Sequence, residues 1–287
     1  MKILVTGIDG FLGKKLGKIL NEKHEIFGTS RKGFRKNVKM IDVTDVKKMS
    51  DYIRKTRTDV LVHNAAIVDV DFCEKEKGTA FEVNAKATGN LAEICKNNGT
   101  RMIYISSDYV FSGPDGGHSV NSKRAPLNNY GLTKKIGEDL IAGHLKNYAI
   151  LRPTILYGFN DFLDDSNIVI NLINRINRNE KIVLDNKRIK YPLLIDDVAH
   201  AVDKLISSDE IGTFHISGPT PVTRYNWGKA VAKAFNLPGR NIFGEDLKEI
   251  NKAQNIKLLG NSFKTNNLER GLKLMRRQME NYIHGNN

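Results

Sequence analysis

Short apolar segments alternate with longer amphipathic segments over the first half of the chain. The apolar segments predict strands at residues 2–6, 25–29, 38–42, 60–64, 102–106 and 149–152. The amphipathic segments between them predict helices at residues 11–22, 45–56, 79–97 and 127–146. Strands that are apolar throughout are typical of parallel sheets with helices on both faces. The pattern therefore predicts an α/β fold with a Rossmann-type, doubly wound parallel sheet.

The alternation becomes irregular after residue 152. Here the pattern predicts helices at residues 165–178, 196–207, 226–236 and 266–282, and short strands at 181–184 and 213–217. We expect residues 1–152 to form the sheet domain and residues 153–287 to form a smaller mixed α/β lobe. Part of this lobe region, near residues 214–216, is expected to return to the sheet.

Composition narrows the class of protein. The 287 residues include 45 Lys and Arg against 32 Asp and Glu, a formal net charge of +13. The basic residues are scattered and accompany no nucleic-acid-binding motif, so we expect them to attract anionic small molecules and not nucleic acid. No apolar run approaches the roughly 18 residues of a membrane span. Cys73 and Cys95 are the only cysteines, which favours a reducing cytoplasm.

Three glycines lie where the first predicted strand turns into the first predicted helix. Gly7 permits a tight turn, Gly10 lets the backbone approach a pyrophosphate, and Gly13 allows close contact between helix and strand. The N-terminus of the helix adds free N–H groups and a partial positive charge. The motif predicts a dinucleotide cofactor.

The end of the second predicted strand distinguishes the two nicotinamide cofactors. NAD-binding proteins usually have Asp or Glu at this point, to accept from a ribose hydroxyl. This chain has Ser30, Arg31 and Lys32, followed by Arg35 and Lys36. A guanidinium can pair with a 2′-phosphate, so Arg31 favours NADP(H), with NAD(H) as the alternative.

Tyr130 and Lys134 are four residues apart on a predicted helix and therefore share one face. A neighbouring ammonium favours the phenolate, so we expect Lys134 to lower the pKa of Tyr130 and make it a proton donor to a carbonyl. Ser107, at the end of the fifth predicted strand, can hydrogen-bond to the same oxygen. Tyr225 and Lys229 repeat the spacing in the second half of the chain, and we assign that pair to packing.

With these motifs, the chain resembles the extended short-chain dehydrogenases/reductases, and in particular the dTDP-4-dehydrorhamnose reductase family. The resemblance is carried by residues 6–13, 64–66, 106–111, 125–134 and 151–158, with weaker similarity at residues 194–199 and 212–218. It implies that Ser107, Tyr130 and Lys134 are catalytic and that Asp108 approaches the substrate, a sugar linked to a nucleoside diphosphate that is reduced at a 4-keto group.

The resemblance also implies a set of cofactor contacts, with the sheet domain holding NADP(H) and the lobe holding the substrate. Besides the glycines and Arg31, these contacts are Asp9, Phe11, Leu12, Ser30, Asp42, Val43, Ala65, Ala66, Ile67, Val68, Tyr130 and Lys134. The oligomeric state is left open, with a homodimer as one candidate.

The chain departs from the rhamnose-reductase pattern in three places. Ile155 stands where those reductases have Trp, and Ala253-Gln254-Asn255 replaces an Ala-Arg-Pro element. The aspartate usual at the end of the second strand is also missing. These differences leave the identity of the sugar open.

Two other functions fit the same motifs. A nucleotide-sugar epimerase or dehydratase is one, although Asp108-Tyr109 lacks the glutamate that dehydratases have after the aspartate. The other is an NADP-binding regulatory subunit, resembling the β subunit of methionine adenosyltransferase. The seven histidines show no paired spacing of metal ligands, so we predict no metal site.

Overall fold

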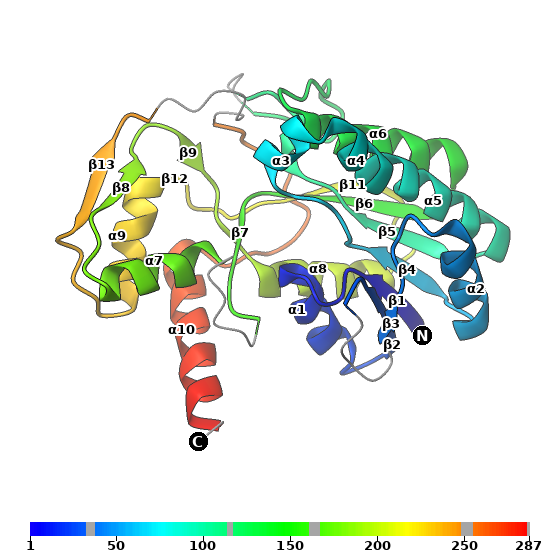
Figure 1. The fold of residues 1–287 in the computed structure, drawn as a ribbon, viewed down its shortest axis with the longest axis horizontal. Helices are drawn as coiled ribbons and strands as arrows, with labels where there is room; N and C mark the ends of the chain where they lie inside the picture. Colours follow the sequence, from blue (N-terminus) through cyan, green and yellow to red (C-terminus); the bar gives the residue numbers. More distant parts are fainter. Residues whose placement is uncertain (33–37, 114–116, 161–166, 248–254, 286–287) are drawn as a thin grey trace.

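The computed structural model describes residues 1–32, 38–113, 117–160, 167–247 and 255–285. Within these residues, a seven-stranded sheet has the order β11-β6-β5-β4-β1-β2-β3, and every neighbouring pair is parallel (Figure 1). Its strands are β1 (Lys2–Thr6), β2 (Glu25–Ser30), β3 (Val38–Met40), β4 (Val60–His63), β5 (Arg101–Ile105), β6 (Tyr148–Pro153) and β11 (Gly212–Ile216). The predicted Rossmann-type α/β fold is confirmed.

Helices cover both faces of the sheet (Figure 1). One face packs against α2 (Val46–Thr56), α5 (Ala87–Asn98) and α6 (Asn129–His144), and the other against α1 (Phe11–Leu20) and α8 (Ile195–Ile206). Alternate side chains of a strand point to opposite faces. Accordingly Val5 belongs to the core beneath α1 and α8, whereas Leu4 belongs to the core beneath α2, α5 and α6.

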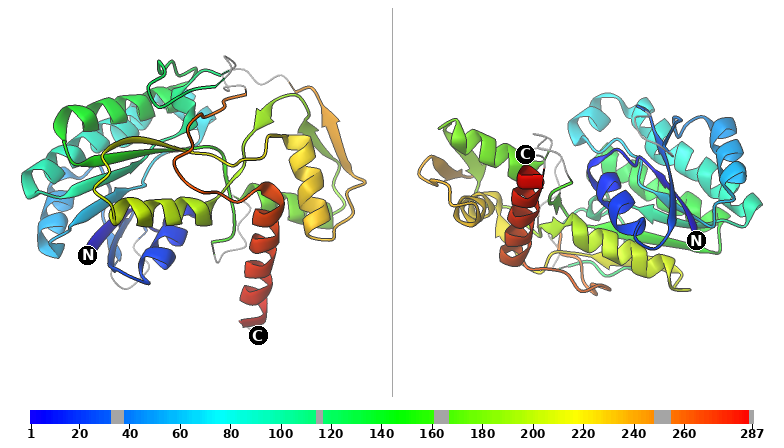
Figure 2. Two further views of the ribbon diagram at one scale, coloured as in Figure 1. Left: turned by 180° about the vertical axis from the view of Figure 1, so that it is seen from behind. Right: turned by 90° about the horizontal axis from the view of Figure 1, so that it is seen from below.

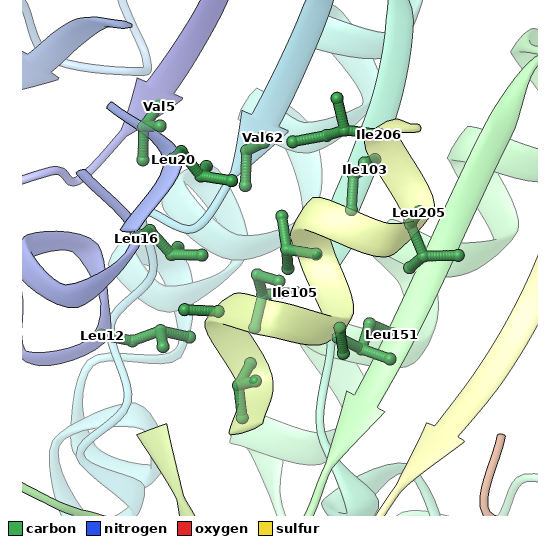
Figure 3. Packing of buried hydrophobic residues seen from close by; sticks show 14 of the residues in the cluster. Val5, Leu12, Leu16, Leu20, Val62, Ile103, Ile105, Leu151, Leu205 and Ile206 are labelled. Carbon is green, nitrogen blue, oxygen red and sulfur yellow. The ribbon is translucent and has the colours of Figure 1, made fainter. Parts of the chain in front are cut away.

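Two elements beyond residue 152 belong to the sheet layer. Strand β11 pairs with β6, which confirms the predicted return near residues 214–216. Helix α8 packs beside α1, and Figure 3 shows its Leu205 and Ile206 in the same core as Ile103 and Leu151. The division at residue 152 into cofactor and substrate parts stays a prediction, but α8 and β11 complete the sheet structurally.

The remaining elements form a smaller lobe beside the sheet (Figure 2). Helices α7 (Ile168–Asn177), α9 (Arg224–Ala234) and α10 (Leu268–Gly285) surround a separate apolar core that includes Trp227, which is 1% exposed. Short strands pair β8 (Ile182–Asp185) with β13 (Ile242–Glu245), β7 (Leu156–Tyr157) with β10 (Leu193–Leu194), and β9 (Ile189–Lys190) with β12 (Val222–Thr223).

Local side-chain bonds explain where the structure departs from the apolar pattern. The strand predicted at 38–42 ends at Met40, because Asp42 accepts hydrogen bonds from the N–H and the hydroxyl of Thr44, at 2.9 and 2.7 Å. The helix predicted at 79–97 is α4 (Lys77–Phe81), a π-helical turn η1 (Glu82–Lys86), and α5. Helix α3 (Val70–Lys75), which the pattern missed, begins after Asp69, whose side chain accepts from the N–H of Phe72 at 2.9 Å.

Candidate active site

The turn between β1 and α1 is built so that a ligand backbone or phosphate can approach it closely. Gly7 has a φ of +64°, and a Cβ atom there would lie 2.9 Å from the Cα of Ala65. A Cβ on Gly13 would lie 2.1 Å from the carbonyl oxygen of Gly7. Gly10, the residue before α1, has no side chain to cover the first turn. The glycine turn and the N-terminus of α1 therefore fit the pyrophosphate of a dinucleotide.

The strand order places this turn at a switch point of the sheet. Strand β1 lies between β2 and β4, so the chain leaves β1 and β4 toward opposite faces. In open α/β sheets, ligands bind in the crevice outside the carboxyl ends of such strands. Here the hydroxyl of Thr6 accepts from the N–H groups of Asn64 and Ala65, both at 3.1 Å, and ties the two loops together.

The predicted cofactor residues after β2 and β4 line the ends of these strands. Arg31 is exposed directly after β2, and the hydroxyl of Ser30 accepts from the N–H of Lys32 at 3.1 Å. Arg35 and Lys36 lie outside the described residues. After β4, Ala66 and Ile67 are partly buried and Val68 is 67% exposed.

The remaining predicted cofactor residues differ in exposure. Leu12 is 5% exposed and Val43 is 8% exposed, and Leu12 packs in the core beneath α1 and α8. These two side chains therefore leave mainly backbone for a ligand to contact. Asp9 and Phe11 are partly exposed at the glycine turn, and Asp42 is exposed beyond β3.

The structure brings Ser107 and Tyr130 together. Ser107 precedes the short 3-10 helix η2 (Asp108–Val110), and its hydroxyl accepts from the N–H of Tyr109 at 3.2 Å. Tyr130 lies in the first turn of α6, which begins after Asn128; the Asn128 side chain accepts from the N–H of Gly131 at 2.8 Å. The Ser107 hydroxyl lies close enough to Tyr130 to lower the pKa of the phenol, and the Tyr109 ring meets the Tyr130 ring edge-on at 5.7 Å.

Lys134 is buried under the same helix, but it does not act on Tyr130 as the sequence predicted. Its ammonium donates to the carbonyl oxygen of Ile105 at 2.6 Å and lies 4.1 Å from the centre of the Tyr104 ring. Burial lowers the pKa of Lys134 to about 7. Burial also raises the pKa of Tyr130 well above its ordinary value, against a lowering contribution from Ser107. The prediction that Lys134 lowers the pKa of Tyr130 is therefore wrong for this structure, because desolvation dominates.

Asp108 lies beside this group, and Lys190 of the smaller lobe reaches it. Desolvation raises the pKa of Asp108 to about 6, while Lys190 and the Ser107 hydroxyl, which donates at 3.2 Å, act in the opposite direction. The Lys190 ammonium lies 5.9 Å from the centre of the Tyr109 ring. Sequence reasoning missed Lys190, because a lysine in a two-residue strand carries no motif.

Asn84, in the π-helical turn η1, is a second residue that sequence reasoning missed. Its side-chain oxygen accepts from the N–H of Ile67 at 2.8 Å, and its amide donates to the Ile67 carbonyl at 2.9 Å. It also donates to the Thr133 hydroxyl at 3.2 Å. Asn84 thus holds the loop after β4 against α6. π-Helical turns are frequent at functional sites, but a single Asn in a helical pattern gives no such signal.

Among the described residues, no group of three or more His, Cys, Asp or Glu side chains is placed to hold a metal ion. None of the helices in the described ranges is long and apolar enough to cross a bilayer.

Comparison with known proteins agrees with this geometry. The family model described as the RmlD substrate binding domain matches residues 1–260. The chain is 32% identical over 247 residues to methionine adenosyltransferase 2 subunit beta of Pongo abelii, covering 84% of this chain and 74% of that protein. It is 28% identical over 243 residues to a probable low-salt glycan biosynthesis reductase of Haloferax volcanii, covering 82% and 80%.

Among solved structures, the dTDP-4-dehydrorhamnose reductase of Bacillus anthracis, in complex with NADP, superimposes with a TM-score of 0.86 at 26% identity. The match covers 96% of this chain and 98% of that one. The family match spans the glycine turn, Ser107, Tyr130, Lys134 and most of the smaller lobe. The chain therefore belongs to the RmlD substrate binding domain family, within the extended short-chain dehydrogenases/reductases.

Proposed function

We propose that this protein is an NADPH-dependent reductase of a 4-keto-6-deoxy sugar linked to a nucleoside diphosphate. The observation that carries the proposal is that Ser107, Tyr130 and Lys134 lie together at the carboxyl end of β5, on the sheet edge that also holds the glycine turn. Similarity to reductases of nucleotide-linked and glycan-building sugars supports the same reaction class.

NADP(H) is the proposed cofactor, with NAD(H) as the alternative. The turn at Gly7, Gly10 and Gly13 would hold the pyrophosphate. Glycine is needed for this turn, because Cβ atoms at Gly7 and Gly13 would clash with the backbone of the protein itself. Residues 28–32 contain no carboxylate, and exposed Arg31 would pair with a 2′-phosphate. The Bacillus anthracis reductase, which was crystallised with NADP, supports this choice.

Tyr130 is the proposed proton donor. Its raised pKa keeps the phenol protonated at neutral pH, so the Oη atom holds a proton when a carbonyl oxygen comes within reach. The alkoxide that forms on reduction is a far stronger base than a phenolate, so transfer of this proton is downhill. The nearby Ser107 hydroxyl would hold the same carbonyl oxygen in place.

When NADPH is bound, it would supply the hydride for the carbonyl carbon. Lys134 would contribute a buried positive charge at the end of β5, where the Ile105 carbonyl fixes its ammonium. This charge stabilises the phenolate that Tyr130 becomes after it gives up its proton. The lysine thus acts after proton transfer, and it need not lower the pKa of the resting phenol.

The smaller lobe would select the substrate. Lys190 brings a cation to the Asp108 side of the site, where the diphosphate or sugar hydroxyls of the substrate would approach. Ile155 packs against the core of the lobe and stands where rhamnose reductases have Trp. We therefore expect a sugar related to, but not the same as, the rhamnose precursor.

The test is a panel of nucleotide-linked 4-keto-6-deoxy sugars incubated with purified protein and NADPH. The expected result is loss of NADPH absorbance with at least one sugar and formation of the 4-hydroxy product. Cofactor that stays bound through dialysis, with interconversion of epimers and no net NADPH consumption, would instead assign an epimerase. A cytoplasmic location and a homodimer stay predictions.

A binding role is the second candidate function. The similarity to methionine adenosyltransferase 2 subunit beta, over 84% of this chain, favours it. The intact Ser107, Tyr130 and Lys134 cluster favours catalysis instead. Tight NADPH binding without turnover on the whole panel would support the binding role.

A further inference from the structure

Glu138 is a buried carboxylate that the proposed reaction does not use. It is 2% exposed and lies on α6, one turn beyond Lys134. Within the described residues its two oxygens accept four hydrogen bonds. Oε1 accepts from the Ser106 hydroxyl at 2.5 Å and from Nε of Arg152 at 2.9 Å. Oε2 accepts from Nη2 of Arg152 at 2.7 Å and from Nη1 of Arg124 at 2.9 Å.

These partners connect Glu138 to the backbone that carries the catalytic residues. Ser106 lies between Ile105, whose carbonyl holds the Lys134 ammonium, and Ser107, whose hydroxyl lowers the pKa of Tyr130. Its own N–H donates to the carbonyl of Leu151 at 2.8 Å. The hydrogen bond from Ser106 to Glu138 therefore fixes the end of β5 against α6.

Arg152 extends the same network to two further segments. Its Nη1 donates to the carbonyl of Val120 at 3.1 Å and lies 3.4 Å from Nε2 of His215, and the guanidinium lies 5.1 Å from the centre of the Phe111 ring. Burying an ion pair is costly unless further hydrogen bonds satisfy its atoms, and here they do. A buried ion pair is weak evidence for added stability, so we consider which segments the Glu138–Arg152 pair holds in place.

We propose that Glu138 is a positioning residue for the reaction, which fixes the β5 end through Ser106 and keeps the Lys134 ammonium charged and in place. The role of Glu138 in the reaction rests on the proposed function, whereas its effect on the charge of Lys134 does not. Removing the carboxylate should loosen Ser107 and make the Lys134 ammonium easier to deprotonate.

Several charged or titratable groups surround Lys134 and Glu138. Around Lys134, Glu138 raises its pKa, and buried His63, whose own pKa is lowered to about 3, stays neutral near pH 7. The groups that face the two residues are Tyr130 on α6, Tyr104 on β5, His63 on β4, Arg152 on β6, His215 on β11, and Arg124 and His118 on the loop before α6. Glu138 itself is the carboxylate that favours the charged form of Lys134.

The test compares Glu138→Gln with Asp139→Asn by NMR titration of ¹³C-labelled lysine side chains, with Lys134 identified through its loss in Lys134→Met. Asp139 is the matched control, because it is the next residue on α6 and binds the same Arg124, but is exposed. In Glu138→Gln the Lys134 midpoint should fall by about one pH unit, as expected for losing a nearby opposite charge. In Asp139→Asn the Lys134 midpoint should stay at its wild-type value. An unchanged midpoint in folded Glu138→Gln would overturn the proposal.

Ser106→Ala keeps the Glu138–Arg152 pair and serves if Glu138→Gln fails to fold. Losing this one bond should speed hydrogen exchange of the Tyr109 N–H, which bonds to the Ser107 hydroxyl, by about tenfold. It should lower the rate of reduction while leaving NADPH affinity within twofold. Unchanged exchange would contradict the proposal. Inactivity of the wild type on every sugar would instead contradict only the proposed function, because the titration and exchange need no substrate.

Discussion

Two helices of this protein carry the same Tyr-x-x-x-Lys spacing in different surroundings. On α6, Tyr130 and Lys134 are buried, and the ammonium binds the Ile105 carbonyl at the carboxyl end of the sheet. On α9, in the smaller lobe, Tyr225 is partly buried and packs against Gly244, while Lys229 is exposed. Lys229 donates to the carbonyl of Gly239 at 3.0 Å and lies 5.8 Å from the centre of the Tyr225 ring.

The comparison shows that the same residue spacing can occur in two different chemical environments. Helical periodicity brings both pairs of side chains onto one face. On α6, the hydroxyl of Ser107 at a strand end lies near the phenol, and burial raises the pKa of Tyr130 and lowers that of Lys134. A buried cation near a phenol can stabilise a phenolate much more than an exposed one, because water screens the exposed charge.

The largest expected contrast comes from removing each phenol. Tyr130→Phe should lower turnover by on the order of 10²- to 10⁴-fold, because a positioned proton donor is lost. Tyr225→Phe should leave turnover near the wild-type value. Steady-state rates of NADPH oxidation with the substrate found on the panel measure both effects. If the two variants exchange these outcomes, the active site is not at the end of β5.

Removing each ammonium gives the next contrast. Lys134→Met should lower turnover by about 10²-fold, since the phenolate left by proton transfer loses its buried counter-charge. Lys229→Met, which replaces an exposed side chain, should have no measurable effect. Circular dichroism of both variants checks that folding is intact. Equal losses in the two variants would mean that the lysine of the motif acts through general stability.

Cofactor affinity can be separated from this chemistry at Arg31. Arg31→Asp should weaken NADPH binding by roughly 10- to 150-fold, because a charge-assisted bond to the 2′-phosphate is replaced by repulsion. Arg240→Asp, an exposed arginine near α9, is the control. Fluorescence titration with NADPH and NADH measures both. NADPH affinity within twofold of the wild type in Arg31→Asp would exclude Arg31 as the selecting residue.

The smallest expected effect is the pH dependence of the wild type. Since burial lowers the pKa of Lys134 to about 7, its ammonium is present below that pH and is lost as pH rises through it. Turnover should therefore fall roughly twofold between pH 6 and pH 7 and continue to fall above it. Lys229→Met should keep this decline, whereas the residual activity of Lys134→Met should lack it.

Much of the fold followed from the sequence, because the strands of the sheet are short apolar runs with strong periodicity on either side. The strand at residues 2–6 was predicted to the residue, and the return of the chain at β11 was predicted from the run around Phe214. The short strands of the lobe, such as β9, were missed, because two residues carry no period. The π-helical turn at Asn84 was missed for a related reason, since it follows from contacts with Ile67 and Thr133 that are distant in sequence.

The motifs predicted which residues form the candidate site, but they did not predict its electrostatics. Spacing placed Tyr130 and Lys134 on one face, and strand order brought Ser107 to them. The direction of the Tyr130 pKa shift depends on desolvation, which a sequence does not display. The Lys190 ammonium lies 5.9 Å from the Tyr109 ring and lowers the pKa of Asp108, which depends on how the lobe lies beside the end of β5.

The path of the chain has a practical consequence for exchanging substrate specificity between relatives. The described elements of the lobe come from two stretches of the chain, one with α7 and one with α9 and α10, and between them the chain adds α8 and β11 to the sheet. A chimera joined at a single point after β6 would replace the sheet edge and the helix over Ile103 and Leu151 together with the lobe. A productive exchange would transplant the lobe segments in register but leave residues 195–216, Asn261 and Phe263 native, because Asn261 pairs with His215 and Phe263 packs against the core beneath α1 and α8.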